Sequence, residues 1–172
     1  MGLMKCEERS LENPQAKDAV WVPNCDQLYY PYVSSCVTVT LVFENGVLGG
    51  HASQVTADKD CDFRQAENLQ DVISRMKSED PGKEKRGALK RIYFIGLTET
   101  EQWELDQAVE VIAKNFEPLK EGKPVKYNRS PVEVVFDGGS LYTLPSKTEL
   151  PKDETQKVAL IKQRGNSESY RA

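Results

Sequence analysis

The clearest pattern of hydrophobic and polar positions is the strict alternation in CVTVTLVF, residues 36–43. One face carries Val37, Val39, Leu41 and Phe43, and the other carries Cys36, Thr38, Thr40 and Val42. A period of two with many β-branched residues is typical of a β-strand. Asn45-Gly46 is a favoured two-residue turn, so VLGGHASQV, residues 47–55, is predicted to return as the partner strand of a hairpin.

Weaker versions of the strand pattern occur elsewhere. AVWV (19–22) is predicted to be a short strand, and RIYFIGL (91–97) a central strand. VEVVF (132–136) and LYTLP (141–145) flank the turn sequence DGGS and predict a second hairpin. KVALIK (157–162) is interpreted as a last strand. The stretch CDQLYYPYVSS (25–35), with tyrosines crowded around Pro31, is interpreted as a structured loop.

Two segments instead show helical spacing. In FRQAENLQDVISRMK (63–77), with Asp62 as a possible N-cap, the apolar stripe is Leu69, Val72, Ile73 and Met76. A second helix is predicted to begin at a capping box formed by Thr98 and Glu101. Its stripe is Leu105, Ala108, Val109, Ile112, Ala113 and Phe116. Between the two helices, the charged stretch 78–91 is predicted to be a mobile loop.

The order of strands, helix, strand, helix and strands predicts an α+β fold. We expect a largely antiparallel β-sheet or sandwich with two packed helices. At 172 residues the chain is expected to form a single domain, 1–172, with loose tails at 1–16 and 163–172.

Composition narrows the function classes. The charged fraction of 29% and hydrophobic fraction of 38% indicate a folded globular protein. A net charge of −4, with acids and bases interleaved, argues against nucleic acid as a partner. No apolar run has the length of an integral membrane segment, and residues 1–15 lack the apolar core of a secretory signal. The expected place of action is the cytoplasm, either the cell's own or that of a host reached by a dedicated secretion system.

Four cysteines and one histidine supply the candidate chemistry. Without a C-x-x-C pair or a second histidine, no structural metal site is predicted, and the thiols are expected to be reduced. Cys36 and His51, the only histidine, are fifteen positions apart on the two strands of the predicted hairpin. An imidazole that accepts the proton of a thiol creates the thiolate nucleophile of amide hydrolysis, and backbone N–H groups around Cys36 could hold the oxyanion.

The ideal hairpin places these two residues on one face but apart. With Asn45-Gly46 at the turn, His51 faces Thr40, and Cys36 lies roughly 13 Å further at a rise of about 3.3 Å per residue. Contact requires a tighter register, a bulge at Gly49-Gly50, or a chain that curls back before Cys36. The alternative interpretation is a buried structural thiol beside an unrelated histidine. Cys25 is a rival nucleophile, and Cys6 and Cys61 lie in polar flanking segments.

SSCVTVTL (34–41) followed by GGHAS (49–53) resembles the core of the CheD-like and cytotoxic-necrotizing-factor-like deamidases. In that superfamily a small residue precedes a strand cysteine, and a histidine follows on the next strand. The chemistry that the resemblance implies is hydrolysis of glutamine side chains to glutamate on a protein substrate, without a cofactor. Carried over, Cys36 would be the nucleophile and His51 the general base and acid.

Two departures favour the toxin-like branch of that superfamily. CheD proteins orient the histidine with an upstream threonine, but no threonine precedes Thr38 here. Gly50 directly precedes His51, whereas CheD proteins have two intervening residues. Toxin-type members can use a main-chain carbonyl to orient the histidine, and here we expect a carbonyl within Val20–Tyr32 or the Tyr30 hydroxyl. The alternative function is a non-catalytic binding module whose contact surface is the aromatic segment Trp21–Tyr32.

Overall fold

The computed structural model describes residues 2–9, 13–34, 36–53, 65–96, 100–146 and 149–171, with only the backbone at 65–68. The strands are β1 (Leu3–Lys5), β2 (Ala19–Pro23), β3 (Gln27–Val33), β4 (Cys36–Phe43), β5 (Gly46–Ser53), β6 (Leu89–Gly96), β7 (Val125–Asn128), β8 (Val132–Asp137), β9 (Ser140–Pro145) and β10 (Asn166–Ser169). The helices are α1 (Gln65–Glu79), α2 (Lys83–Arg86), α3 (Gln102–Asn115) and α4 (Glu154–Arg164).

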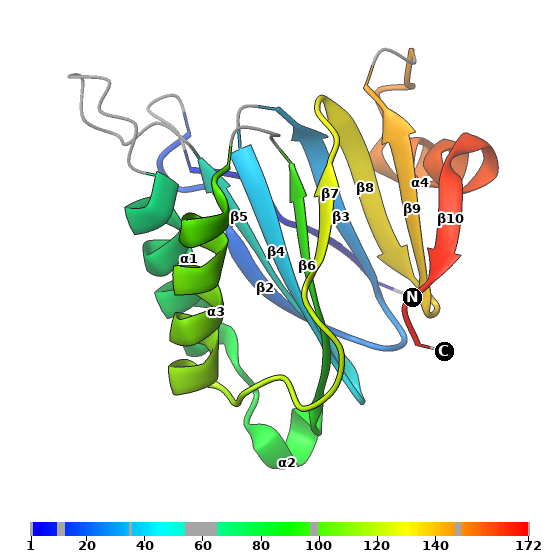
Figure 1. The fold of residues 1–172 in the computed structure, drawn as a ribbon. Helices are drawn as coiled ribbons and strands as arrows, with labels where there is room; N and C mark the ends of the chain where they lie inside the picture. The colour runs from blue at the N-terminus through cyan, green and yellow to red at the C-terminus, as the bar shows by residue number, and fades with distance from the viewer. Residues whose placement is uncertain are drawn as a thin grey trace.

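These elements form a sandwich of two five-stranded sheets with helices on its outer faces (Figure 1). Sheet I has the strand order β2-β5-β4-β6-β7, and sheet II has the order β1-β3-β8-β9-β10. Most pairs are antiparallel, while β1–β3 and β6–β7 are parallel. Helices α1 and α3 cover the outer face of sheet I, and α4 covers sheet II. The predicted α+β class is therefore confirmed. Among the described residues, no helix is long and apolar enough to cross a membrane.

Strand β4 is buried along its whole length because both of its faces meet a core. Its outward residues pack with the buried stripe of α1, where Leu69, Ile73 and Met76 are fully enclosed as predicted. Its inward residues face sheet II, where the polar ones are hydrogen-bonded. Thr38 Oγ1 donates to the Ile95 carbonyl at 3.0 Å, which satisfies a hydroxyl that would otherwise be costly to bury.

The β4–β5 hairpin turns at Glu44-Asn45, one residue earlier than predicted, so Phe43 pairs with Gly46. Tertiary contacts explain the difference. A Cβ at position 46 would lie 2.5 Å from the Trp21 ring and the Val22 carbonyl, so Gly46 is needed where β2 passes, not for the turn. The turn itself is held from outside, because the Asn45 N–H donates to the Arg86 carbonyl at 3.0 Å.

The predicted loop at 25–35 is wrong, because most of it forms β3 between β1 and β8. Tyr29 and Tyr30 are fully buried on its opposite faces. The register with β8 shifts between Tyr30 and Val33, and Tyr32 adopts a positive φ of 46°. This irregularity accommodates Pro31, which has no N–H for a ladder hydrogen bond.

The predicted strand at 157–162 is also wrong, because these residues belong to α4. The Asp153 side chain caps this helix by accepting from the Gln156 N–H at 3.0 Å. Val158 and Ile161, three residues apart, pack on the outer face of sheet II. The expected tail at 163–172 instead includes β10 and the buried Tyr170.

Two other segments are more ordered than predicted. Residues 78–91 contain the end of α1, helix α2 and the start of β6. Arg86 is almost fully buried between Asp80 and Glu117, each at 2.9 Å, which argues against a mobile loop. The expected arm at 1–16 contains β1, and Cys6 is fully buried. Asp62 and Thr98 lie outside the described residues; Glu101 is the N-cap of α3, and its N–H donates to the Glu104 carboxylate.

Candidate functional site

The observed register brings Cys36 and His51 together. His51 pairs with Thr38 rather than Thr40, and Cys36 is two positions along on the same face of β4. Diagonal neighbours of this kind are within reach of a long side chain. The distance between Cys36 Sγ and His51 Nε2 is 2.9 Å, and both residues are buried, with exposed fractions of 0% and 1%. Of the three routes to contact considered above, the tighter register is the one observed.

The second ring nitrogen of His51 contacts a main-chain carbonyl. Nδ1 lies 3.0 Å from the carbonyl oxygen of Cys6. Since a carbonyl only accepts hydrogen bonds, Nδ1 carries the proton of the neutral ring, and the lone pair of Nε2 faces the thiol. The expected orienting group in Val20–Tyr32 was therefore wrong in position. The Tyr30 hydroxyl is engaged elsewhere, 2.7 Å from Thr40 Oγ1 and 3.2 Å from the Val39 carbonyl.

Cys6 reaches this position because the N-terminal segment is fixed on both sides. The Cys6 N–H donates to the Tyr29 carbonyl and the Glu7 N–H donates to the Lys17 carbonyl, each at 2.9 Å. The His51 N–H donates to the Asp18 carbonyl at 2.9 Å. The Asp18 carboxylate is itself buried and paired with Arg75 of α1, with the closest approach at 2.5 Å. Main-chain hydrogen bonds thus set both the ring and the carbonyl that orients it.

The paired glycines give two large side chains room to approach β5. A Cβ on Gly49 would lie 2.4 Å from the Tyr30 hydroxyl, and one on Gly50 would lie 2.5 Å from Met76 Sδ. The Tyr30 ring packs edge-on against the His51 imidazole, with centroids 5.8 Å apart. No bulge is present in this hairpin, because its register is continuous from Cys36 to Phe43.

A third side chain, Glu8, joins the pair. Its carboxylate, the Cys36 sulfur and a ring nitrogen of His51 lie within 4.8 Å of one another. The same carboxyl hydrogen-bonds with the Ser53 hydroxyl. Sulfur, nitrogen and oxygen donors are a set that suits Zn²⁺, so these three residues are the ones that could hold a soft divalent ion. Three protein ligands would leave a fourth position open.

Burial holds the pair in its neutral form. Desolvation raises the pKa of the Cys36 thiol, and the charge of Glu8 adds to the rise. Desolvation lowers the pKa of His51 to about 4, against the opposing effect of the Cys6 carbonyl. Burial also raises the pKa of Glu8. Near neutral pH the pair therefore rests as thiol and imidazole joined by an S–H···N hydrogen bond.

Sequence reasoning missed both Glu8 and the role of Cys6. No periodic pattern marks KCEER (residues 5–9), and a carbonyl contact requires no particular side chain. The one available signal was Cys6 itself, since cysteine is among the most frequently buried residue types. The rival nucleophile Cys25 is exposed, and Cys61 lies outside the described residues.

The aromatic segment Trp21–Tyr32 does not form one exposed surface. Tyr29 and Tyr30 are buried, and Trp21 packs on the core between sheet I and the helices. Only Tyr32 among the described tyrosines of this segment is well exposed, at 62%. The alternative interpretation as a binding module therefore lacks two of the rings on which it depended.

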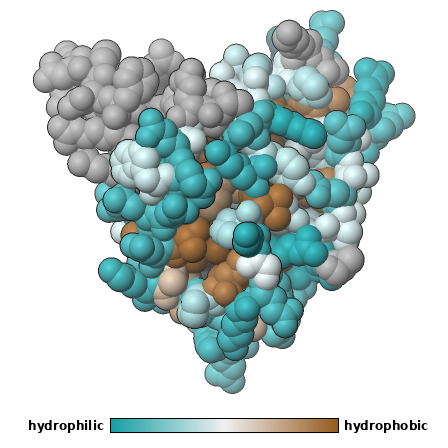
Figure 2. Space-filling model, in the orientation of Figure 1, coloured by the Kyte–Doolittle hydropathy of each residue, from teal (hydrophilic) through white to brown (hydrophobic). Residues whose placement is uncertain are grey.

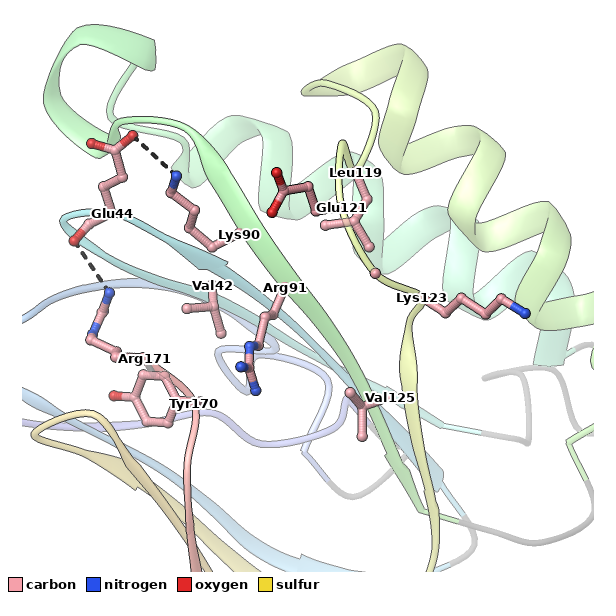
Figure 3. Close-up of a pocket in the computed structure, with 11 residues that line it drawn as sticks. Val42, Glu44, Lys90, Arg91, Leu119, Glu121, Lys123, Val125, Tyr170 and Arg171 are labelled. Atoms are coloured by element: carbon pink, nitrogen blue, oxygen red, sulfur yellow. Dashed lines mark hydrogen bonds and ion pairs between the residues drawn. The ribbon is translucent and has the colours of Figure 1, made fainter.

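Two cavities lie away from the pair. One of about 740 Å³ is at the other end of β4, near Val42, roughly 20 Å along the strand from Cys36 at about 3.3 Å per residue. Figure 3 shows two of its basic side chains already engaged: Lys90 with the Glu44 carboxylate and Arg171 with the Glu44 carbonyl. A second, of about 370 Å³, lies between α3 and β7, where Figure 2 shows hydrophobic side chains bordered by hydrophilic ones.

Comparison with known proteins gives limited information. No family model matches the chain, and no curated protein is significantly similar to it in sequence. Among solved structures, the chain is similar to the C-terminal domain of CNFy from Yersinia pseudotuberculosis. The TM-score is 0.37 and the sequence identity is 7%, over 83% of this chain and 52% of that domain's chain. The chain thus spans about half the length of this structural neighbour.

Proposed function

We propose that this protein is a cysteine-dependent amide hydrolase that deamidates glutamine side chains of a protein substrate. The observation that carries the proposal is the 2.9 Å contact between Cys36 Sγ and His51 Nε2, with Nδ1 held by the Cys6 carbonyl. This arrangement has the three parts of an activated nucleophile: the nucleophile, a base with its lone pair aimed at it, and a group that orients the base. The choice of glutamine comes from the sequence resemblance in residues 34–53 to the toxin-like deamidases.

The first half of the reaction forms a thioester. Nε2 accepts the Cys36 proton, and the sulfur attacks the carbon of the glutamine amide. The resulting oxyanion needs backbone N–H donors near the sulfur, and the main chain at Ser34, which acts to lower the pKa of the thiol, would supply one. The imidazolium then returns its proton to the amide nitrogen, and the C–N bond breaks to release ammonia.

The second half consumes water. Nε2 accepts a proton from a water molecule, and the hydroxide attacks the thioester carbon. The C–S bond breaks, glutamate leaves, and the proton on Nε2 returns to the sulfur. Overall, one amide and one water give one carboxylate and one ammonium ion. Throughout, the Cys6 carbonyl accepts from Nδ1–H and stabilises the imidazolium as it forms.

The test is to incubate the protein with a cytosolic extract and map glutamine-to-glutamate changes by mass spectrometry, while ammonia release is measured. Cys36→Ser and His51→Ala should each lower conversion by about 10²-fold or more, the range typical of losing a nucleophile or its base. Cys25→Ser, which changes an exposed thiol, is the matched control and should retain full activity. Added hydroxylamine should intercept the thioester and leave a hydroxamate at the same glutamines.

The proposal fails if either variant converts glutamines at the wild-type rate while its circular dichroism shows an intact fold. It also fails if the wild-type protein neither converts a glutamine in the extract nor forms a hydroxamate.

A further inference from the structure

Glu8 has no part in the mechanism above, yet its carboxylate is the nearest acidic group to the nucleophile among the described residues. It lies within 4.8 Å of both the Cys36 sulfur and a ring nitrogen of His51. Cys36 and His51 are buried, whereas Glu8 is half-buried and borders solvent. A substrate must bring its amide carbon into contact with the sulfur, and Glu8 is a partly exposed side chain beside it.

The main chain around Glu8 is pinned, and this leaves the side chain as the part that can move. The N–H groups of Cys6 and Glu7 donate to carbonyls of neighbouring segments, both at 2.9 Å. On the other side, only the side chain of Arg9 is held, because its Nε donates to the Ala16 carbonyl at 3.2 Å. Moving this backbone would also withdraw the Cys6 carbonyl from His51. Rotation of the Glu8 side chain alone would keep the ring oriented by the Cys6 carbonyl.

The chemistry of this side chain matches the proposed reaction. Glutamate is the product of glutamine deamidation, with the same number of methylene groups and the same planar head. We propose that Glu8 occupies the place of the substrate's side chain, so that the resting enzyme holds a product-like carboxylate of its own chain against its nucleophile. This inference rests on the proposed function. It names both a self-blocked resting state and the kind of side chain that the site accepts.

Two physical effects make the blocked state chemically unreactive. A carboxylate is a poor electrophile, so the sulfur does not react with it. Its negative charge, within 4.8 Å of the sulfur, also repels the negative charge of a thiolate. A neutral glutamine amide that replaces Glu8 removes both effects at once. Binding of the substrate side chain is thereby coupled to activation of the nucleophile. The apparent affinity for substrate equals the affinity of the unblocked state multiplied by the fraction of molecules in that state.

The first arm of the test measures access to the sulfur without requiring catalysis. Wild-type protein, Glu8→Ala and Glu7→Ala are alkylated with iodoacetamide at pH 7 in the presence of EDTA, and each cysteine is followed by mass spectrometry. Cys25, which is exposed, serves as the internal standard. Glu8→Ala should raise the labelling rate of Cys36 about tenfold or more, because the sulfur loses a neighbouring side chain and its negative charge, and Glu7→Ala should not. An unchanged Cys36 rate in Glu8→Ala overturns the proposal.

The second arm asks whether position 8 lies at the reaction site. In the Glu8→Gln variant, the introduced glutamine should be converted to glutamate by the protein's own Cys36, which restores the wild-type sequence and is seen as a mass increase. The conversion should be absent in Glu8→Gln/Cys36→Ser and in Glu7→Gln. If the introduced glutamine persists while the same protein deamidates substrates in the extract, this inference is overturned and the proposed function stands. If neither that glutamine nor any glutamine of the extract is converted, both fail.

Discussion

The titration of His51 gives a sharp test of the site, because this is the only histidine in the chain. Burial lowers its pKa from 6.5 to about 4 in the folded protein, whereas the unfolded chain should have the ordinary value. Well above pH 6.5 the histidine is neutral in both states and contributes nothing to the pH dependence. As the pH falls from 6.5 to 4, the unfolded chain takes up the proton first, so folding stability is lost across this window.

The magnitude follows from the difference between the two pKa values. Each unit corresponds to about 1.4 kcal/mol, so wild-type protein should lose about 2 to 3 kcal/mol between about pH 7 and pH 4.5 because of this group alone. Carboxylates also titrate there, so the useful quantity is a comparison with His51→Gln. Glutamine is neutral and of similar size, and it retains a donor for the Cys6 carbonyl. The pH-dependent loss should be smaller in this variant by that amount.

The measurement is urea unfolding of both proteins at a series of pH values from about 7 to 4.5. In parallel, the single histidine Hε1 signal in the NMR spectrum of the wild-type protein should titrate with a midpoint well below that of an ordinary histidine. The comparison does not depend on the absolute stability of the variant, only on how that stability changes with pH. Equal pH slopes in the two proteins, or an ordinary histidine titration near about 6.5, would show that the ring is solvated and refute the buried pair.

Two further predictions concern the groups around the ring. Gly49→Ala should destabilise the protein by about 1 to 3 kcal/mol, because it pushes a Cβ against the Tyr30 hydroxyl. In urea unfolding, the double variant Gly49→Ala/Tyr30→Phe should be destabilised by less than the sum of the two single variants, by more than about 0.5 kcal/mol. Strict additivity of the two effects would contradict the clash. Cys6→Ala should leave the titration of His51 unchanged in the same NMR experiment, because the hydrogen bond to the ring is made by the main-chain carbonyl of Cys6. If the pKa of His51 instead returned to the ordinary histidine value, the Cys6 side chain would be the group that keeps it low.

Much of the fold could be predicted because several elements are amphipathic with a clear period. The alternation in 36–43 indicated both faces of β4, and Leu69, Ile73 and Met76 indicated the buried side of α1. The sequence was misleading where an apolar run was short. Residues 158–161 fit a strand or a helix equally well, and the Asp153 cap and burial of only every third residue decide for the helix. Pro31 suggested a loop because the bulge that accommodates it depends on β8.

The site was predicted in part for a similar reason. Parity along the strands placed Cys36 and His51 on one face, which the structure confirms. Their separation was wrong because the local preference of Asn-Gly for the turn is overridden by Trp21 and Arg86, which are distant in sequence. The orienting carbonyl could not be predicted at all, since every residue has one. Glu8 depends on how the N-terminal segment docks, and no local pattern encodes that contact.

The parallel pairing of β1 with β3 has a consequence for the order in which the site assembles. Cys36 and His51 are 15 positions apart on a hairpin, a contact that closes quickly, whereas the carbonyl of Cys6 is 45 positions from the ring. A partly folded molecule that has made only the hairpin holds an unoriented imidazole beside an ordinary thiol. The orientation of the His51 ring is therefore complete only after β1 has joined sheet II.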